Sequence, residues 1–249
     1  MVFILIFKFI KKITKRFLRH LGWKLIKIKI KSPTTHPHPD PDIKNINCIL
    51  GATGVLHIGA HRGTEAGVYD WFKKKVLWVE AIPEIFLELN DHISRFYNQR
   101  AVCALLGDKN KDNLNFFVAN NDSASSSLFD FSEDVKKKKL WSNQDIKMIK
   151  KISLKMVTLD DLFQKLNINS SDYNHWILDA QGAELLILKG AKNSLINCRS
   201  MQIEVSKSKF YEGGVLWEDL LFFLKKNYFF PTSTPKTEHT EILFIKKNK

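Results

Sequence analysis

The sequence predicts an α/β protein with a mostly parallel sheet that carries helices on both faces. From about residue 53 onward, short apolar segments of strand character alternate with segments whose apolar residues repeat at helical spacing. Strands that alternate with crossover helices form a parallel sheet covered on both faces. A second observation is at the end of the chain, where residues 228–230 and 241–245 predict an antiparallel strand pair.

The first half of this region predicts four strands and two helices. Residues 55–58, which are apolar except for His57, and residues 76–79 are short apolar runs, as expected of buried strands, and residues 85, 86, 89 and 93 are apolar at helical spacing. Residues 108–113 predict a turn. The predicted strands are 55–58, 76–79, 100–106 and 114–118, and the predicted helices are 64–73 and 83–97.

The second half begins with residues 119–150, which are polar and predict irregular structure, including a lysine run at 136–139 on a solvated face. Beyond it the alternation resumes without an internal repeat. The predicted helices are 158–166, 183–195 and 217–226, and the predicted strands are 176–178 and 201–205.

The positive charge is concentrated at the N-terminus. The chain has 249 residues and a net charge of +13, and residues 1–31 contain ten Lys and Arg and no acid, which leaves about +3 for the rest. A near-neutral domain argues against nucleic acid as the partner. Three widely spaced cysteines indicate neither a disulfide framework nor a zinc site, so we expect a reducing, cytoplasmic setting and no bound metal.

Residues 1–31 predict a basic amphipathic arm. Ile6, Phe9, Ile13 and Phe17 recur at helical steps, and Lys8 interrupts the apolar run too early for a bilayer span. Such an arm either lies on an anionic membrane surface, which would place the protein at the inner membrane face, or docks on its own domain. The proline-rich residues 32–46 predict a linker, and residues 47–249 predict the domain.

The strongest local signal is a strand that enters a glycine-containing turn at Gly59 and Gly63 and then a helix. Glycines let the backbone turn sharply and approach a ligand closely. Glu80 ends the next strand, where an acid hydrogen-bonds the ribose hydroxyls of a nucleoside cofactor. Its alternative role is a surface acid that caps the turn before Pro83. Because His61 and Thr64 replace the glycines of a dinucleotide fingerprint, the turn favours S-adenosylmethionine over NAD.

Residues 177–191, ILDAQGAELLILKGA, resemble the signature D-x-E/Q-G-A-E-x-x-x-L-x-G-A of the FkbM methyltransferases. The segments VTLDDL at 157–162, SASSSL at 123–128, QIEVS at 202–206 and YEG at 211–213 also match that family, in its order. The resemblance covers about residues 53–247. It implies a Rossmann-like class I methyltransferase fold, S-adenosylmethionine as donor, and O-methylation of sugars or small natural products. His57 and His61 depart from the Asp and Asn that family members often carry at these two positions.

Methyl transfer to a hydroxyl needs a base for the proton and a positioned acceptor. Asp179, at the end of a central strand, is the first candidate for the base, although it could also cap the following helix. Glu204 is the second candidate, for acceptor binding, while Glu184 in the first helical turn suits a structural role equally well. His57, inside a strand, fits a core histidine as well as a cofactor neighbour.

The loop 122–127 is expected either to close over the adenine or acceptor, or to be a mobile surface segment. The residues expected at the cofactor are His57, Gly59, Ala60, His61, Arg62, Gly63, Glu80, Ala81, Asp108, Asp179 and Gln181.

Three functions are consistent with these residues. The leading one is an O-methyltransferase for a sugar hydroxyl of a glycan, a lipid-linked sugar or a similar small molecule. The second is an RNA methyltransferase that uses the basic arm, against which stand the near-neutral domain and the absence of an N/D-P-P-Y/F tetrapeptide. The third is a non-catalytic, membrane-associated binding module on the same fold, against which stands the presence of Gly59, Gly63, Glu80 and Asp179.

Overall fold

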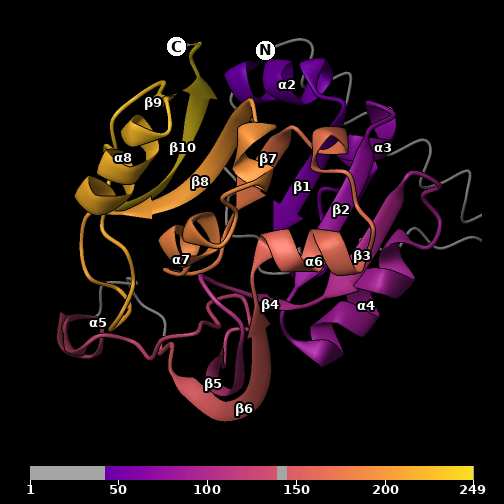
Figure 1. Ribbon diagram of the computed structural model, residues 1–249. Coiled ribbons are helices and arrows are strands. Elements are labelled where there is room, and N and C mark those ends of the chain that lie inside the picture. The colour runs from indigo at the N-terminus through magenta and orange to yellow at the C-terminus, as the bar shows by residue number, and fades with distance from the viewer. Residues whose placement is uncertain (1–42, 139–144, 249) are drawn as a thin grey trace, which may run out of the picture. The chain divides into compact units, whose positions relative to one another are not determined.

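A computed structural model describes residues 43–138 and 145–248 (Figure 1). The predicted arm at 1–31, most of the linker and the end of the lysine run lie outside these residues. None of the described helices is long and apolar enough to cross a membrane. The helices are α2 (Ile43–Gly51), α3 (Ala66–Trp71), α4 (Pro83–Ile93), α5 (Glu133–Lys138), α6 (Leu159–Lys165), α7 (Glu184–Lys189) and α8 (Trp217–Lys226), with 3-10 turns at Ser170–Asp172 and Ser194–Ile196.

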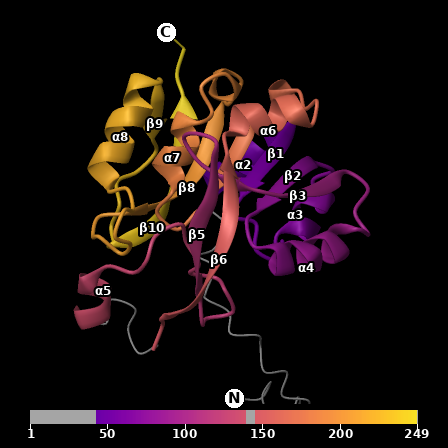
Figure 2. The same ribbon diagram turned by 60° about the horizontal axis from the view of Figure 1, so that its bottom comes forward.

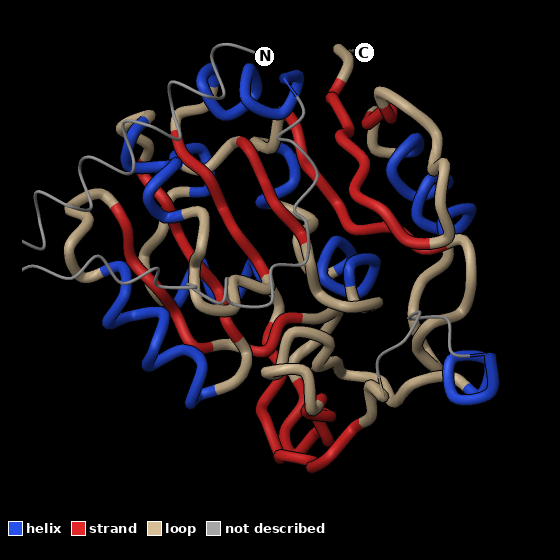
Figure 3. The backbone as a smooth tube through the Cα atoms, turned by 180° about the vertical axis from the view of Figure 1, so that it is seen from behind, coloured by secondary structure: helices blue, strands red, loops and turns tan. Residues whose placement is uncertain are grey.

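The strands form two sheets. The large sheet has seven strands in the order β3-β2-β1-β7-β8-β10-β9, and Figure 3 shows them from behind. The small sheet has the order β4-β6-β5. The strands are β1 (Gly54–Ile58), β2 (Lys75–Glu80), β3 (Gln99–Cys103), β4 (Leu105–Leu106), β5 (Lys111–Ala119), β6 (Met148–Val157), β7 (His175–Leu178), β8 (Ser200–Ser206), β9 (Phe229–Pro231) and β10 (His239–Lys246).

The large sheet is parallel except for β10, which pairs antiparallel with both β8 and β9. The predicted mostly parallel sheet and antiparallel C-terminal pair are therefore confirmed. The sequence did not predict that the last strand would insert between β8 and β9. The small sheet lies at the end of the molecule toward which the parallel strands point, and it comes forward in Figure 2.

Alternate residues of the central strands serve the two faces of the large sheet. In β1, Leu56 and Ile58 belong to one core cluster, which includes apolar residues of α6, α7 and α8. Val55 of the same strand belongs to a second cluster, which includes residues of α2, α3 and α4. Side chains of a strand point to opposite faces in turn, so a continuous apolar run such as 55–58 needs helices on both sides.

Several predicted boundaries are wrong. The predicted strand 100–106 is two strands in different sheets, because the Ala104 amide donates to the Glu80 carbonyl and the chain then leaves β2 to pair with β6. The helix predicted over 183–195 ends at Lys189, where Gly190 packs so closely on the Gly107 carbonyl that no Cβ would fit. The helices predicted at 64–73 and 83–97 are shorter at their ends. Residues 43–46, assigned to the linker, belong to α2.

The segment 119–150 is less irregular than predicted. It contains α5 and the start of β6, a strand of ten residues. In β6 the apolar residues Ile152, Leu154 and Met156 alternate with polar ones, and this two-residue period is the signal of a half-buried strand. The frequent lysines in this strand made the alternation hard to recognise in the sequence.

Two histidines are buried in the large sheet without a charged partner. His175 of β7 is fully buried, its Nδ1 lies 2.8 Å from the Ser200 hydroxyl, and burial lowers its pKa from 6.5 to about 3. His57 of β1 stacks on Trp78, and burial lowers its pKa also. The fold therefore requires both rings to be neutral.

We expect acid to destabilise the protein partly through His175. The pKa of His175 is lower in the folded than in the unfolded state. The contribution of its neutral ring to the free energy of unfolding is therefore complete above pH 6.5 and is lost as the pH falls toward 3. Between pH 6.5 and 5 this loss is about 1.5 kcal/mol of unfolding free energy. Urea denaturation at both pH values should show a drop smaller by that amount in His175→Asn than in the wild type. An equal drop in both proteins would contradict the prediction.

Candidate active site

The carboxyl ends of β1 and β7 meet where the strand order of the large sheet reverses direction. Ligands of open α/β sheets bind at this position. The Asp179 amide donates to the Ile58 carbonyl at 3.0 Å. Gly59 has a φ of +78°, and a Cβ on it would lie 1.7 Å from the Asp179 carbonyl oxygen. Only glycine fits here, so the turn after β1 and the turn after β7 are in direct contact.

The glycine turn is also tied to the end of β2. The amides of Gly59 and Ala60 donate to the Val79 carbonyl at 3.0 and 3.2 Å, and the His61 amide donates to Glu80 Oε2 at 2.9 Å. Glu80 Oε1 accepts the amide of Ile82 at 2.7 Å. Burial raises the pKa of Glu80, and these backbone hydrogen bonds oppose that rise. Glu80 thus lies beside the glycine turn, as the sequence predicts, and it is not a surface acid.

His57 does not face this site. Its Nδ1 lies 3.1 Å from the Tyr69 hydroxyl, and its ring stacks on Trp78 inside the core beneath α3 and α4. Ala60 is also packed in this cluster. The structure places the His57 side chain in the core, which was one of its two predicted roles, and not at the cofactor site, which was the other.

His61 and Arg62 connect the glycine turn to the loop after β5. Arg62 binds Asp122 through two hydrogen bonds of 2.7 and 3.0 Å, and it also forms an ion pair with Glu88. His61 Nε2 lies 2.8 Å from the Asp122 carbonyl. Asp122 and Ser123 both have positive φ, so this part of the loop bends tightly over the turn.

Hydrogen bonds hold the buried serines of this loop. Ser127 is fully buried and donates to the Gln181 carbonyl at 2.7 Å. Ser125 accepts an amide proton from Asn121 Nδ2 at 2.8 Å, and its carbonyl accepts from the Tyr211 hydroxyl at 3.2 Å. The loop therefore holds the turn that contains Gln181.

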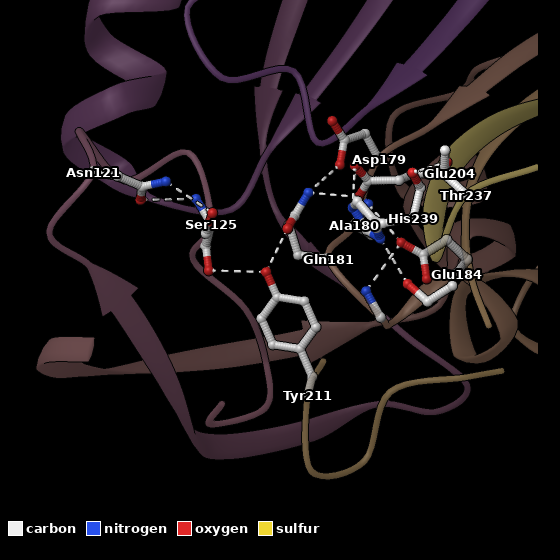
Figure 4. A network of polar contacts seen from close by, with 12 residues as sticks. Asn121, Ser125, Asp179, Ala180, Gln181, Glu184, Glu204, Tyr211, Thr237 and His239 are labelled. Atoms are coloured by element: carbon white, nitrogen blue, oxygen red, sulfur yellow. Dashed lines mark hydrogen bonds and ion pairs between the residues drawn. The ribbon is translucent and has the colours of Figure 1, made fainter. Parts of the chain in front are cut away.

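Asp179, Gln181 and Glu204 form a chain of polar contacts at the ends of β7 and β8 (Figure 4). Gln181 Nε2 donates to Asp179 Oδ1 at 2.5 Å and to Glu204 Oε2 at 2.6 Å. Its Oε1 accepts from the Tyr211 hydroxyl. Gln181 has a φ of +52°, a strained value for a residue with a side chain. The turn thus places one amide between two carboxyl groups.

Both carboxyl groups resist ionisation. Burial is the main cause that raises the pKa of Asp179 well above its ordinary value, and the charge of Glu204 raises it further. Burial likewise raises the pKa of Glu204 to about 8. Two buried carboxyls that share one donor cannot both ionise at low cost, so near neutral pH the pair holds a proton.

Glu184 has the structural role that was one of its two predicted roles. It is buried, and its Oε1 accepts the amides of Ala180 at 2.9 Å and Gly182 at 3.1 Å. Burial raises its pKa to about 7. It holds the turn from Asp179 to Gly182 against the start of α7.

Two residues of this network were not identified from the sequence as functional. His239 at the start of β10 places Nε2 2.7 Å from Glu204 Oε1, and Tyr211 joins Gln181 to the serine loop. Extending the predicted strand 241–245 by two residues toward the N-terminus would have brought His239 to the edge where Glu204 lies. Tyr211 was noted only as part of a family motif.

The remaining predicted residues are less closely joined to the site. Gly107, next to Asp108, packs on Met156 and Gly190. Ala81 follows Glu80 and accepts a weak hydrogen bond from the Cys103 thiol at 3.9 Å. Among the residues that the structure describes, no group of three or more His, Cys, Asp or Glu is arranged to hold a metal ion.

Comparison with solved structures gives distant similarities. A TehB-like methyltransferase from Corynebacterium glutamicum has 11% identity and a TM-score of 0.42, over 93% of this chain and 94% of that one. Fibrillarin from Aeropyrum pernix, with bound S-adenosylmethionine, has 10% identity and a TM-score of 0.40, over 77% and 66%. Because these TM-scores are below 0.5, the strand order and the family match below, and not these structures, identify the fold. Among curated proteins none matches the chain.

A family model supplies the identification. The model of the FkbM methyltransferase domain matches residues 57–230, which include the glycine turn, Glu80, the carboxyl pair and the intervening serine loop. This match confirms the family that the sequence resembles, and with it the class of fold and S-adenosylmethionine as the cofactor. The chain belongs to the FkbM methyltransferase family.

Proposed function

We propose that the protein transfers a methyl group from S-adenosylmethionine to a hydroxyl oxygen, most specifically to a sugar hydroxyl of a glycan, a lipid-linked sugar or a small natural product. The observation that carries this proposal is the buried Asp179–Glu204 pair beside the glycine turn. A hydroxyl must lose its proton as its oxygen attacks, and a carboxyl whose pKa is raised toward neutrality suits that task.

The residues around the glycine turn fit the cofactor. Each oxygen of Glu80 accepts one backbone amide, and a carboxylate oxygen can accept a second hydrogen bond, so both oxygens can still bind ribose hydroxyls. Gly59 lets the backbone turn without a side chain at the edge of the site. Glu80 would then hold the ribose, and Asp179 and Gln181 would lie toward the reacting end.

The chemistry divides between the cofactor and the protein. When bound, S-adenosylmethionine supplies a methyl group on a positively charged sulfur. Asp179 takes the proton of the acceptor hydroxyl, and Gln181 holds Asp179 in position through its amide. Glu204 orients the acceptor. The anchored serine loop and the Arg62–Asp122 contact cover the glycine turn and exclude water from it.

The N-terminal arm bears on where the acceptor is found. Its basic and apolar residues suit an anionic membrane surface, and a protein held there would meet lipid-linked sugars. We therefore place the protein in the cytoplasm, peripheral at the inner membrane face, with a lipid-linked sugar among the first acceptors to screen.

Loss of the Glu80 carboxylate should weaken cofactor binding. We expect Glu80→Ala to raise the Kd for S-adenosylmethionine at least tenfold, because hydrogen bonds to a charged group each contribute about 1.5–3 kcal/mol. Isothermal titration calorimetry of the full chain measures this. Glu84→Ala, which removes a nearby exposed acid on α4, is the control and should bind as the wild type does. Equal affinity in the two variants would refute the assignment of Glu80.

Removal of the base should slow the chemical step. With an acceptor found by screening, Asp179→Asn should reduce kcat by about 10²- to 10⁴-fold, the usual contribution of general base catalysis. Asn keeps the size and an acceptor oxygen for Gln181. Asp172→Asn, which alters an exposed carboxylate paired with Lys75, serves as the matched control. An unchanged kcat in Asp179→Asn would exclude this residue as the base.

A further inference from the structure

The carboxyl pair has one asymmetric feature. Glu204 receives two contacts, from Gln181 Nε2 at 2.6 Å and from His239 Nε2 at 2.7 Å. Asp179 shares the Gln181 donor with it, and a side-chain hydrogen bond also joins the two carboxyls. His239 Nδ1 in turn lies 2.7 Å from the Ser206 hydroxyl. If Ser206 donates to Nδ1, the ring is neutral and its Nε2–H points at Glu204 (Figure 4).

We propose that His239 is a positioning residue that holds the negative charge of the pair on Glu204 and the shared proton on Asp179, and that Asp179 releases this proton to solvent when the positively charged donor binds. The O–H bond of Asp179 breaks, its electron pair stays on the carboxylate, and the proton enters the buffer. The inference rests on the proposed function, which places Asp179 beside the sulfonium. It adds that donor binding itself converts Asp179 into a base.

The location of the proton follows from hydrogen bonding. A carboxylate that accepts more hydrogen bonds is the more stable anion, so the charge stays on Glu204 and the proton on Asp179. Burial lowers the pKa of His239, while the carboxylates of Asp179, Glu184 and Glu241 oppose that effect. This agrees with a neutral ring that acts as a donor.

Further acids lie near the pair. Glu184 from α7 and Glu241 from β10 act on Glu204, and each disfavours its negative charge. Among the described residues, no salt bridge joins a lysine or arginine to Asp179, Glu184 or Glu204. A bound sulfonium would bring a positive charge beside these carboxyls. Its arrival favours the ionised form of Asp179.

The two forms of the cofactor separate this proposal from simple binding. S-adenosylhomocysteine lacks the positive charge and should bind without proton release. Titration calorimetry of the full chain at pH 7, in buffers of different ionisation enthalpy, counts the protons. We expect about one proton released per S-adenosylmethionine and about none per S-adenosylhomocysteine. Accordingly, the Kd for S-adenosylmethionine should fall by up to about tenfold per pH unit as the pH rises from 6 to 7.

Two carboxyl variants test the origin of the proton. Glu204→Gln removes the charge that adds to burial in keeping the proton on Asp179, so proton release at pH 7 should decrease. Glu84→Gln is the control, because Glu84 is an exposed acid of α4 that pairs with Lys150, and release should persist. Proton release in Glu204→Gln equal to that of the wild type would overturn the proposal.

Two variants at position 239 test the histidine. His239→Phe keeps ring packing on Phe210 but removes the donor, whereas His239→Gln retains an N–H donor. In His239→Phe we expect the ratio of the affinities for S-adenosylmethionine and S-adenosylhomocysteine to differ at least threefold from the wild-type ratio at pH 7. In His239→Gln we expect this ratio to be closer to the wild-type ratio. A general packing defect would weaken both ligands equally and leave the ratio unchanged, which would overturn the role of His239.

The outcomes also separate this inference from the proposed function. Binding of both cofactor forms to the wild type with equal proton counts would refute the inference and leave the methyltransferase proposal intact. Failure of the folded wild type to bind either form would refute both.

Discussion

The contact between Gly59 and Asp179 is the constraint on which the site depends. It joins the first and the seventh strand at their carboxyl ends, so closely that the backbone of one turn lies where a side chain of the other would be. Two further residues of the site are positioned relative to this contact. Glu80 is tied to the same glycine turn, and Gln181 lies two residues beyond Asp179. The same contact therefore positions both the glycine turn with Glu80 and the Asp179–Glu204 pair.

The surrounding structure stabilises the turn at Gln181, which is energetically unfavourable in itself. Gln181 has a strained backbone, and it lies between two carboxyls that burial makes hard to ionise. Ser127, Tyr211 and Glu184 each hold this turn from a different segment. A strained backbone conformation persists only where several surrounding contacts hold it, and such conformations are common at functional sites.

The sequence predicted the parts of the protein that depend on local pattern. The strands 55–58 and 76–79 were found because continuous apolar runs mark strands buried on both faces, and Glu80 and Asp179 were found because they end such strands. β6 was missed because lysines fill its exposed face. His239 was missed because its partner, Glu204, lies 35 positions earlier, and only the pairing of β10 with β8 brings the two together. The pairing of strands that are this far apart in the sequence cannot be predicted from a short segment.

The position of β10 has a consequence for biosynthesis. Because β10 fills the gap between β8 and β9, two earlier strands have no neighbour on that side until residues 239–246 are made. The strands β1, β2 and β3, with the glycine turn, could pair during translation, while the gap between β8 and β9 closes only when residues 239–246 are made. A ribosome that stops before His239 would release a chain with exposed strand edges, which are sites of aggregation. The same strand supplies His239, which contacts Glu204.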